Sequence, residues 1–268
     1  MRHLARIISV LTLAVVATSF VNVRATGGEA RGPRVTVVAE LFTSEGCSSC
    51  PSADDLLKAL IETQPVEGVE VLGLSSHVDY WDRLGWRDPF SSPFFSARQS
   101  TYGADVFRSD GNYTPQLVVD GSLEAIGSDK GAVRKILLEA AKRPKATVTV
   151  TVAGETDRMA QVDVRIDVPE ALAGHGAADI VVAVAEDGLV THVKRGENNG
   201  RTLSHAGVVR SLTTVGRIEA GARTATAHAS LTLAPDWKPG SLRFVAFVQD
   251  MASHRIFGAG SSALSQGR

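Results

Sequence analysis

The chain has 268 residues, an apolar fraction of 44%, a charged fraction of 21% and a formal net charge of −1. This length suits two domains of roughly 110–120 residues each. The near-neutral charge excludes nucleic acid as an expected partner, and the composition excludes an acidic disordered chain.

The first 25 residues have the pattern of a secretory signal peptide. Arg2, His3 and Arg6 give a positive start, an apolar stretch follows at 7–23, and small or aliphatic side chains precede the expected cleavage point. The alternative is an uncleaved membrane anchor, but the apolar stretch is shorter than the ~20 residues that a span needs. We therefore expect an exported protein, periplasmic or secreted, with no membrane span after cleavage of residues 1–25.

Residues 33–142 have the pattern of a mixed α/β domain. A β-branched strand, an amphipathic helix and a second strand indicate a βαβ unit with parallel strands. Ser92 as N-cap and Pro93 at the first helical position predict a short helix that reaches Tyr102. In chain order, the expected elements are strands at 35–42 and 69–75 around a helix at 53–61, the short helix, a hairpin of 116–119 and 123–126, and a helix at 129–141.

An insertion at 77–113 interrupts this pattern and holds nine of the fifteen aromatic residues of the chain. Such a concentration predicts an ordered segment. We expect either a small subdomain that packs on itself or a lid over the site, with Tyr80 and Trp81 as the candidate substrate-binding residues.

The segment 145–264 changes to short apolar or alternating strands separated by Gly, Pro and Asp, beyond a linker at 142–145. Strand signals at this spacing predict an all-β sandwich domain. The expected strands are 147–152, 161–168, 180–185, 189–193, 225–233 and 242–248. The charged segment 195–205 could contact the first domain, a partner or only water.

The chain has two cysteines, Cys47 and Cys50, separated by two serines. A bridge that closes so short a loop removes only ~2 kcal/mol of unfolded-state entropy, so stapling is a poor reason for the pair. A thiol at a helix N-terminus faces free backbone N–H groups that lower its pKa. The pattern therefore predicts Cys47 as an exposed nucleophile and Cys50 as a shielded resolving thiol.

Thr114-Pro115 opens the expected hairpin, and Pro115 is a candidate for a cis peptide bond. A strand, a C-x-x-C motif at a helix start and a later Thr-Pro before a hairpin resemble the thioredoxin fold. The resemblance implies that Pro115 is cis and packs beside the cysteines, and that the backbone of Thr114 pairs with substrate. The expected fold class is thus an α/β thioredoxin-like N-terminal domain followed by an all-β sandwich.

A closer resemblance covers nearly the whole mature chain. It is carried by segments that resemble the secreted, thioredoxin-like domain-of-unknown-function 1223 family: 40–51, 77–82, 85–90, 113–116, 195–198 and 200–203. The resemblance implies a fold and a redox-type site, and it gives no substrate.

Two further residues near the cysteines have competing interpretations. Glu40 stands where thioredoxins carry a buried acid that moves protons for the resolving cysteine, although the spacing differs by one residue. The alternative is a strand glutamate that faces solvent. His77 could join Cys47 and Cys50 in a soft set of ligands for Cu(I), or it could be a structural histidine bound near Asp79 or Asp82.

The sequence therefore predicts an extracytoplasmic thiol–disulfide oxidoreductase without a cofactor. Its catalytic residues would be Cys47, Cys50, Pro115 and Glu40, and its partners would be exported proteins with thiols or disulfides and a redox partner. The alternatives are a copper-binding or copper-delivery protein that uses Cys47, Cys50 and His77, and a scaffold whose cysteine pair is idle.

Overall fold

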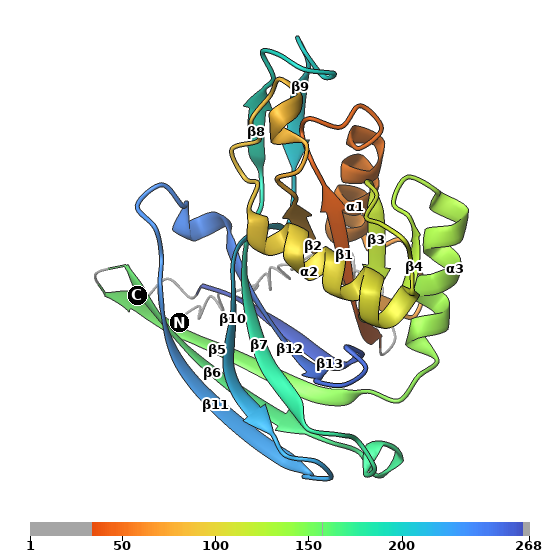
Figure 1. Ribbon diagram of the computed structural model, residues 1–268. Helices are drawn as coiled ribbons and strands as arrows, with labels where there is room; N and C mark the ends of the chain where they lie inside the picture. The colour runs from red at the N-terminus through yellow and green to blue at the C-terminus, as the bar shows by residue number, and fades with distance from the viewer. Residues whose placement is uncertain (1–33, 157, 265–268) are drawn as a thin grey trace, which may run out of the picture. The chain divides into compact units, whose positions relative to one another are not determined.

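Figure 1 shows the computed structural model of the protein, which describes residues 34–156 and 158–264. The expected signal peptide, residues 1–25, lies outside the described residues. The helices and strands are, in chain order, β1 (Val35–Thr43), α1 (Pro51–Thr63), β2 (Val69–His77), α2 (Pro93–Thr101), β3 (Gln116–Val119), β4 (Leu123–Ile126), α3 (Lys130–Ala141), β5 (Ala146–Thr156), β6 (Met159–Asp167), β7 (Ala178–Glu186), β8 (Leu189–His192), β9 (Thr202–His205), β10 (Val208–Ile218), β11 (Thr224–Thr232), β12 (Leu242–Asp250) and β13 (Ile256–Ala263). None of the helices among these residues has the length and apolar character needed to cross a membrane.

The elements expected in the first part of the chain are confirmed. β1 and β2 are parallel neighbours joined through α1, and β3 pairs antiparallel with β1 and with β4. The short helix α2 begins after Ser92, whose side chain accepts a hydrogen bond from the backbone N–H of Phe94 as an N-cap should. Local periodicity and capping decide these elements, so the sequence alone was sufficient to find them.

The expected fold class, a thioredoxin-like α/β domain followed by a separate β-sandwich, is wrong. Eleven strands from both parts form one mixed sheet in the order β11-β6-β5-β13-β12-β7-β10-β2-β1-β3-β4, and β8 and β9 form a separate ribbon. The connecting strand is β10, whose Val208 pairs in parallel with Ser75 of β2. No sequence pattern indicated β10, because polar residues interrupt its apolar residues.

Helices cover both faces of the sheet at the end formed by β1 to β4 (Figure 1). On one face, Ala39 and Leu41 of β1 pack with α1 and α3. On the other face, Val38 and Phe42 pack with α2 and with strands of the second part, β7 and β12. A third apolar core lies among β5 to β7, β10, β11 and β12. Because successive side chains of a strand point to opposite faces, β1 contributes to two cores at once.

The insertion 77–113 is ordered, as its aromatic content predicted. Phe95 and Tyr102 are 5% and 2% exposed and belong to the core shared with Val181 and Phe247 of the second part. The segment therefore packs against the sheet rather than only on itself. Side-chain contacts fix the expected linker 142–145 to the first part of the chain: Arg143 donates to Ser122, and Lys145 pairs with Asp120. Independent folding of the two parts stays a prediction.

Candidate functional site

The two cysteines form a disulfide at the point where β1 leads into α1. Cys50 is the N-cap residue of α1, and its Cα atom lies 5.4 Å from that of Cys47. Pro51 takes the first helical position, where a missing backbone N–H leaves no hydrogen bond unmade. The predicted arrangement of strand, C-x-x-C motif and helix is confirmed.

Both sulfur-bearing residues are buried. Cys47 and Cys50 are each 0% exposed, whereas Ser48 and Ser49 between them are exposed. The expectation of an exposed Cys47 is therefore wrong, and the expectation of a shielded Cys50 is confirmed. The hydroxyl of Ser49 lies 3.3 Å from Sγ of Cys47 and is the donor, because a disulfide sulfur carries no proton.

The segment around Pro115 forms one wall of the site. The Thr114-Pro115 peptide bond is cis, as expected, and the carbonyl oxygen of Thr114 lies 4.0 Å from Sγ of Cys47. The indole N–H of Trp81 donates to the hydroxyl of Thr114 at 2.8 Å. Trp81 also packs on the turn before the cysteines. A Cβ atom added to Gly46 in this turn would lie 3.1 Å from the Cβ of Trp81. These contacts cover Cys47 from the side of the insertion.

Tyr80 belongs to the same wall, one step away from the disulfide. Its hydroxyl donates to Oε1 of Gln99 at 3.2 Å. Burial raises the pKa of this hydroxyl, against the opposing effect of hydrogen bonds with Thr114 and Gln99. The three predicted substrate-binding residues, Thr114, Tyr80 and Trp81, are therefore in contact with one another, and Thr114 is the one that lies next to Cys47.

Glu40 takes neither of the two places considered for it. It is 3% exposed, so it does not face solvent, and Arg98 binds both of its carboxylate oxygens, at 2.7 and 3.1 Å. Its neighbours Ala39 and Leu41 face α1, so the alternation of the strand directs Glu40 to the opposite face, toward α2. The one-residue difference in spacing noted in the sequence thus changes the face of the sheet on which this carboxylate lies.

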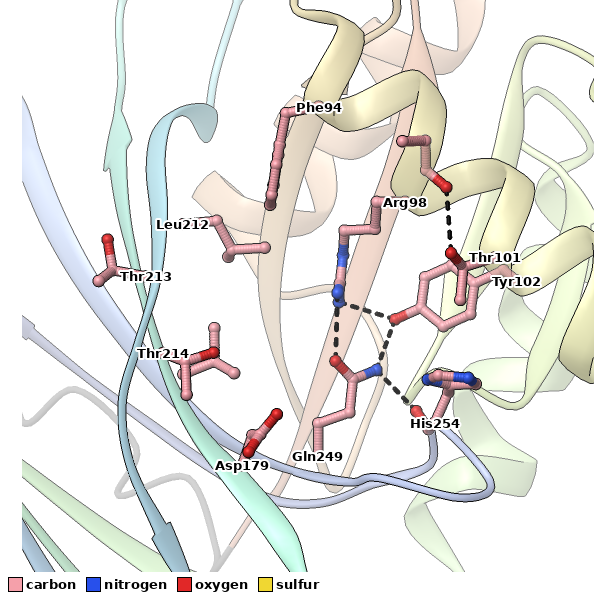
Figure 2. Close-up of a pocket in the computed structure, with 12 residues that line it drawn as sticks. Phe94, Arg98, Thr101, Tyr102, Asp179, Leu212, Thr213, Thr214, Gln249 and His254 are labelled. Carbon is pink, nitrogen blue, oxygen red and sulfur yellow. Dashed lines mark hydrogen bonds between the residues drawn. The ribbon is translucent and has the colours of Figure 1, made fainter.

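Figure 2 shows the surroundings of Arg98. Its guanidinium also donates to the hydroxyl of Tyr102 at 2.8 Å and to Oε1 of Gln249 at 3.1 Å. These groups line a pocket of about 610 Å³ between α2 and the strands β7, β10 and β12. No residue of the cysteine motif lines this pocket, so it is separate from the disulfide.

The second wall of the disulfide site comes from residues 194–201, the loop between β8 and β9. Asn198 is 1% exposed, and its Nδ2 donates to the carbonyl oxygens of Glu45 and Cys47, both at 2.9 Å. Oε2 of Glu197 accepts a hydrogen bond from the backbone N–H of Ser48 at 3.0 Å. Of the three possibilities for segment 195–205, contact with the first part of the chain is the one observed.

Beneath the cysteine turn lies a buried cluster of two histidines and three carboxylates. Nδ1 of His77 lies 2.7 Å from Oδ2 of Asp88, and Nε2 of His205 lies 3.1 Å from Oε1 of Glu45. Asp54, in the first turns of α1, accepts a hydrogen bond from the hydroxyl of Thr43 at 2.8 Å, and its other oxygen lies 3.9 Å from Nδ1 of His205. His77 is thus a structural histidine whose partner is Asp88 rather than Asp79 or Asp82.

Burial and pairing shift the pKa values in this cluster. Desolvation opposes the charged form of His77, but the charge and hydrogen bond of Asp88 outweigh it and raise the pKa of His77 above 6.5. Burial likewise opposes ionisation of Asp88, yet His77 and two backbone N–H groups lower its pKa. Burial raises the pKa of Asp54 despite the nearby histidines. The cluster therefore favours a charged His77–Asp88 pair.

The proposed copper ligands are not arranged as a metal centre. Among the described residues, no group of three or more His, Cys, Asp and Glu side chains is placed to hold a metal ion. Cys47 and Cys50 are bonded to each other, and one ring nitrogen of His77 is engaged by Asp88. The geometry therefore gives no support to the copper alternative.

Sequence reasoning assigned no role to Glu197, Asn198 or His205. Asn198 and Glu197 lie about 150 positions beyond the cysteines, so no local pattern connects them with the motif. The available signal was the family resemblance, which included segment 195–198.

Comparison with known proteins finds solved structures of similar fold. A crystal structure of a protein from Agrobacterium tumefaciens is 29% identical, with a TM-score of 0.67 over 88% of this chain and 97% of the other. HBP35 of Porphyromonas gingivalis is 16% identical, with a TM-score of 0.64 over 87% of this chain and 76% of the other, and it is similar in fold. No protein with a curated description matches this sequence significantly. The family model described as protein of unknown function DUF1223 matches residues 38–249, and the chain therefore belongs to the DUF1223 family.

Proposed function

We propose that this protein is a thiol–disulfide oxidoreductase that acts in an extracytoplasmic compartment. One observation carries the proposal: the two cysteines form a disulfide at the start of α1, with the carbonyl oxygen of the cis Thr114-Pro115 peptide 4.0 Å from Sγ of Cys47. The signal-peptide pattern of residues 1–25 supports the compartment, which permits disulfides to persist.

The order of attack follows from the placement of the two sulfurs. Cys47 precedes the helix and is followed by the exposed Ser48 and Ser49, whereas Cys50 is inside the helix start. A partner thiolate attacks Sγ of Cys47, the bond between the two sulfurs breaks, and Cys50 leaves as a thiolate. A second partner thiolate then attacks the partner sulfur of the mixed disulfide, which releases an oxidised partner and a reduced Cys47.

The same exchange runs in reverse when the partner is a disulfide. Cys47 as thiolate then attacks one sulfur of the partner disulfide and releases the other as a thiolate. Cys50, whose proton passes to solvent, attacks Sγ of Cys47 and releases the second partner sulfur. In each direction two electrons pass between the partner and the cysteine pair, and the relative potentials decide the direction. Exported proteins with thiols or disulfides are the substrates that this chemistry fits.

A trapping experiment tests the proposal. In Cys50→Ser, Cys47 still attacks a disulfide but no resolving thiol remains, so covalent complexes should accumulate. In Cys47→Ser the remaining thiol is Cys50, which the proposed order of attack makes the resolving residue, so it should trap nothing. Both variants and the double variant Cys47→Ser/Cys50→Ser are exported, quenched in acid and compared on non-reducing gels.

Complexes with Cys50→Ser that disappear on reduction, and that are absent from the double variant, support the proposal. Equal trapping by both single variants, or trapping by neither in the presence of disulfide-bearing exported proteins, refutes it.

A further inference from the structure

The loop 194–201 is held against the cysteine turn by its own backbone geometry. Its ends are closed by hydrogen bonds from the N–H of Val193 to the carbonyl of Arg201 and from the N–H of Gly200 to the carbonyl of Val193, both at 2.9 Å. Gly196 has a φ of +72°, and a Cβ atom there would lie 3.1 Å from Cβ of Trp86. Glycine at position 196 therefore permits both the positive φ and the close approach of the loop to Trp86.

Asn198 fixes the loop relative to the cysteines. Besides its two bonds to the carbonyls of Glu45 and Cys47, its Oδ1 accepts from the guanidinium of Arg201 at 2.9 Å. Every polar atom of this buried amide side chain thus has a partner. An arrangement so fully satisfied leaves the neighbouring Glu197 little freedom to move away from Cys47.

Glu197 places a negative charge on the backbone N–H that directly follows Cys47. Hydrogen bonding by Ser48, through its side chain first and its backbone N–H second, lowers the pKa of the Glu197 carboxyl, so this group is ionised near neutral pH. In a C-x-x-C motif at a helix start, the backbone N–H groups and the helix dipole are the features that stabilise a thiolate. The carboxylate of Glu197 accepts from the N–H of Ser48, the residue next to Cys47, so a negative charge lies beside this helix start.

We propose that Glu197 sets the redox poise of the Cys47–Cys50 pair. The disulfide is uncharged at sulfur, whereas the reduced pair can carry a thiolate at Cys47. The carboxylate of Glu197, bound at the residue next to Cys47, repels that thiolate. Glu197 therefore stabilises the oxidised form and lowers the reduction potential of the pair, and this role deepens the proposed function and rests on it.

The expected effect follows from Coulomb's law. For two unit charges about 6 Å apart, removal of one changes an equilibrium by roughly threefold at the dielectric constant of water and by about a hundredfold at an effective value of ~20. Glu197 is exposed and Cys47 is buried, so we expect an intermediate value of about tenfold. A tenfold change in the equilibrium constant of a two-electron couple corresponds to about 30 mV.

The test compares Glu197→Gln with the native protein. Glutamine keeps an oxygen that can accept from Ser48 and removes only the charge. Glu197→Asp keeps the charge, and Glu219→Gln makes the same charge change beyond the far end of β10, about 36 Å along the strand from Val208. Each protein is equilibrated with graded glutathione or dithiothreitol buffers, quenched by alkylation, and the reduced fraction is measured by mass spectrometry.

At about pH 8 the equilibrium constant for reduction of Glu197→Gln should be about tenfold higher than that of the native protein, and the pKa of the Cys47 thiol should fall. Glu197→Asp and Glu219→Gln should stay close to native. At about pH 5, where the thiol is protonated, the difference should disappear. The other titratable groups around the cysteine turn are the same in all four proteins: Glu45, Asp54, His77, Asp88 and His205.

An unchanged potential in Glu197→Gln overturns this inference, as does a shift of equal size at both pH values, which would indicate a structural effect. The measurement needs no protein substrate. A shifted potential together with failed trapping by Cys50→Ser would therefore reject the proposed function alone, and successful trapping with an unshifted potential would reject the role of Glu197 alone.

Discussion

Replacement of Arg98 by methionine tests whether the buried ion pair of Glu40 and Arg98 stabilises the fold. Glu40 is 3% exposed and the side chain of Arg98 is 15% exposed, so removal of the guanidinium leaves a carboxylate buried without its counter-charge. Loss of one partner from a buried ion pair costs about 3–5 kcal/mol. Arg98 also lies over the rings of Tyr102 and Phe247, at 5.0 and 5.8 Å, contacts worth about 0.5–1 kcal/mol each at exposed sites.

We therefore expect Arg98→Met to lose about 3–5 kcal/mol of unfolding free energy, a large share of the ~5–15 kcal/mol typical of a domain. In the double variant Arg98→Met/Glu40→Gln the orphaned charge is absent, so its loss should be smaller than the two single losses together by about 1–3 kcal/mol. Urea unfolding of the four proteins, with the disulfide intact, measures this coupling. A loss below about 1 kcal/mol in Arg98→Met, or strict additivity, would refute the reasoning.

The remaining predictions concern the cluster beneath the turn and access to the disulfide. The pKa of His77 is raised above its unfolded value of 6.5, so its pairing with Asp88 contributes stability that is complete below pH 6.5 and is lost as the pH rises through the folded value. His77→Gln should therefore flatten the decline of unfolding free energy above pH 6.5, and a profile parallel to that of the native protein would contradict the assignment. Asn198→Ala, which frees the loop 194–201, should speed reduction of the disulfide by small thiols roughly thirtyfold, because one hydrogen bond to each of two carbonyls is lost at about 1 kcal/mol net per bond. A matched variant of an exposed residue, Asn112→Ala, should leave that rate unchanged, and equal rates for all three proteins would show that the loop does not limit access.

The sequence was a sound guide to local structure and a poor guide to long-range pairing. The apolar pattern of nine residues predicted strand β1, and that of thirteen residues predicted helix α1. Strand β10 carries Arg210, Ser211, Thr213 and Thr214 among its apolar residues, so no periodic signal identified it. Without β10, nothing in the sequence indicated that the strands of the second part continue the sheet of the first.

The same distinction applies to the site. Cys47, Cys50, Thr114 and Pro115 could be predicted because a motif and a proline identify them without knowledge of the fold. Asn198 reaches Cys47 across 151 positions, and only the folded chain shows this contact. The assignment of Glu40 to the site was based on approximate spacing, and a strand does not tolerate a shift of one residue because each shift reverses the face.

The burial of the disulfide decides from which side a partner approaches. To expose Cys47, the contacts on one of its two sides must open. On the side of Thr114, Trp81 packs against the turn and belongs to a core that also contains Phe95 and Tyr102. On the side of the loop 194–201, hydrogen bonds from Ser48 to Glu197 and from Asn198 to two carbonyls must break, at about 0.5–1.5 kcal/mol net for a neutral bond and about 1.5–3 kcal/mol for one to a charged group. Opening on the loop side therefore costs only a few kcal/mol and leaves the apolar core intact. For the proposed exchange we therefore predict that a partner thiol approaches Cys47 from the side of Glu197, so that the residue we infer to set the redox poise would also lie on the path of the substrate.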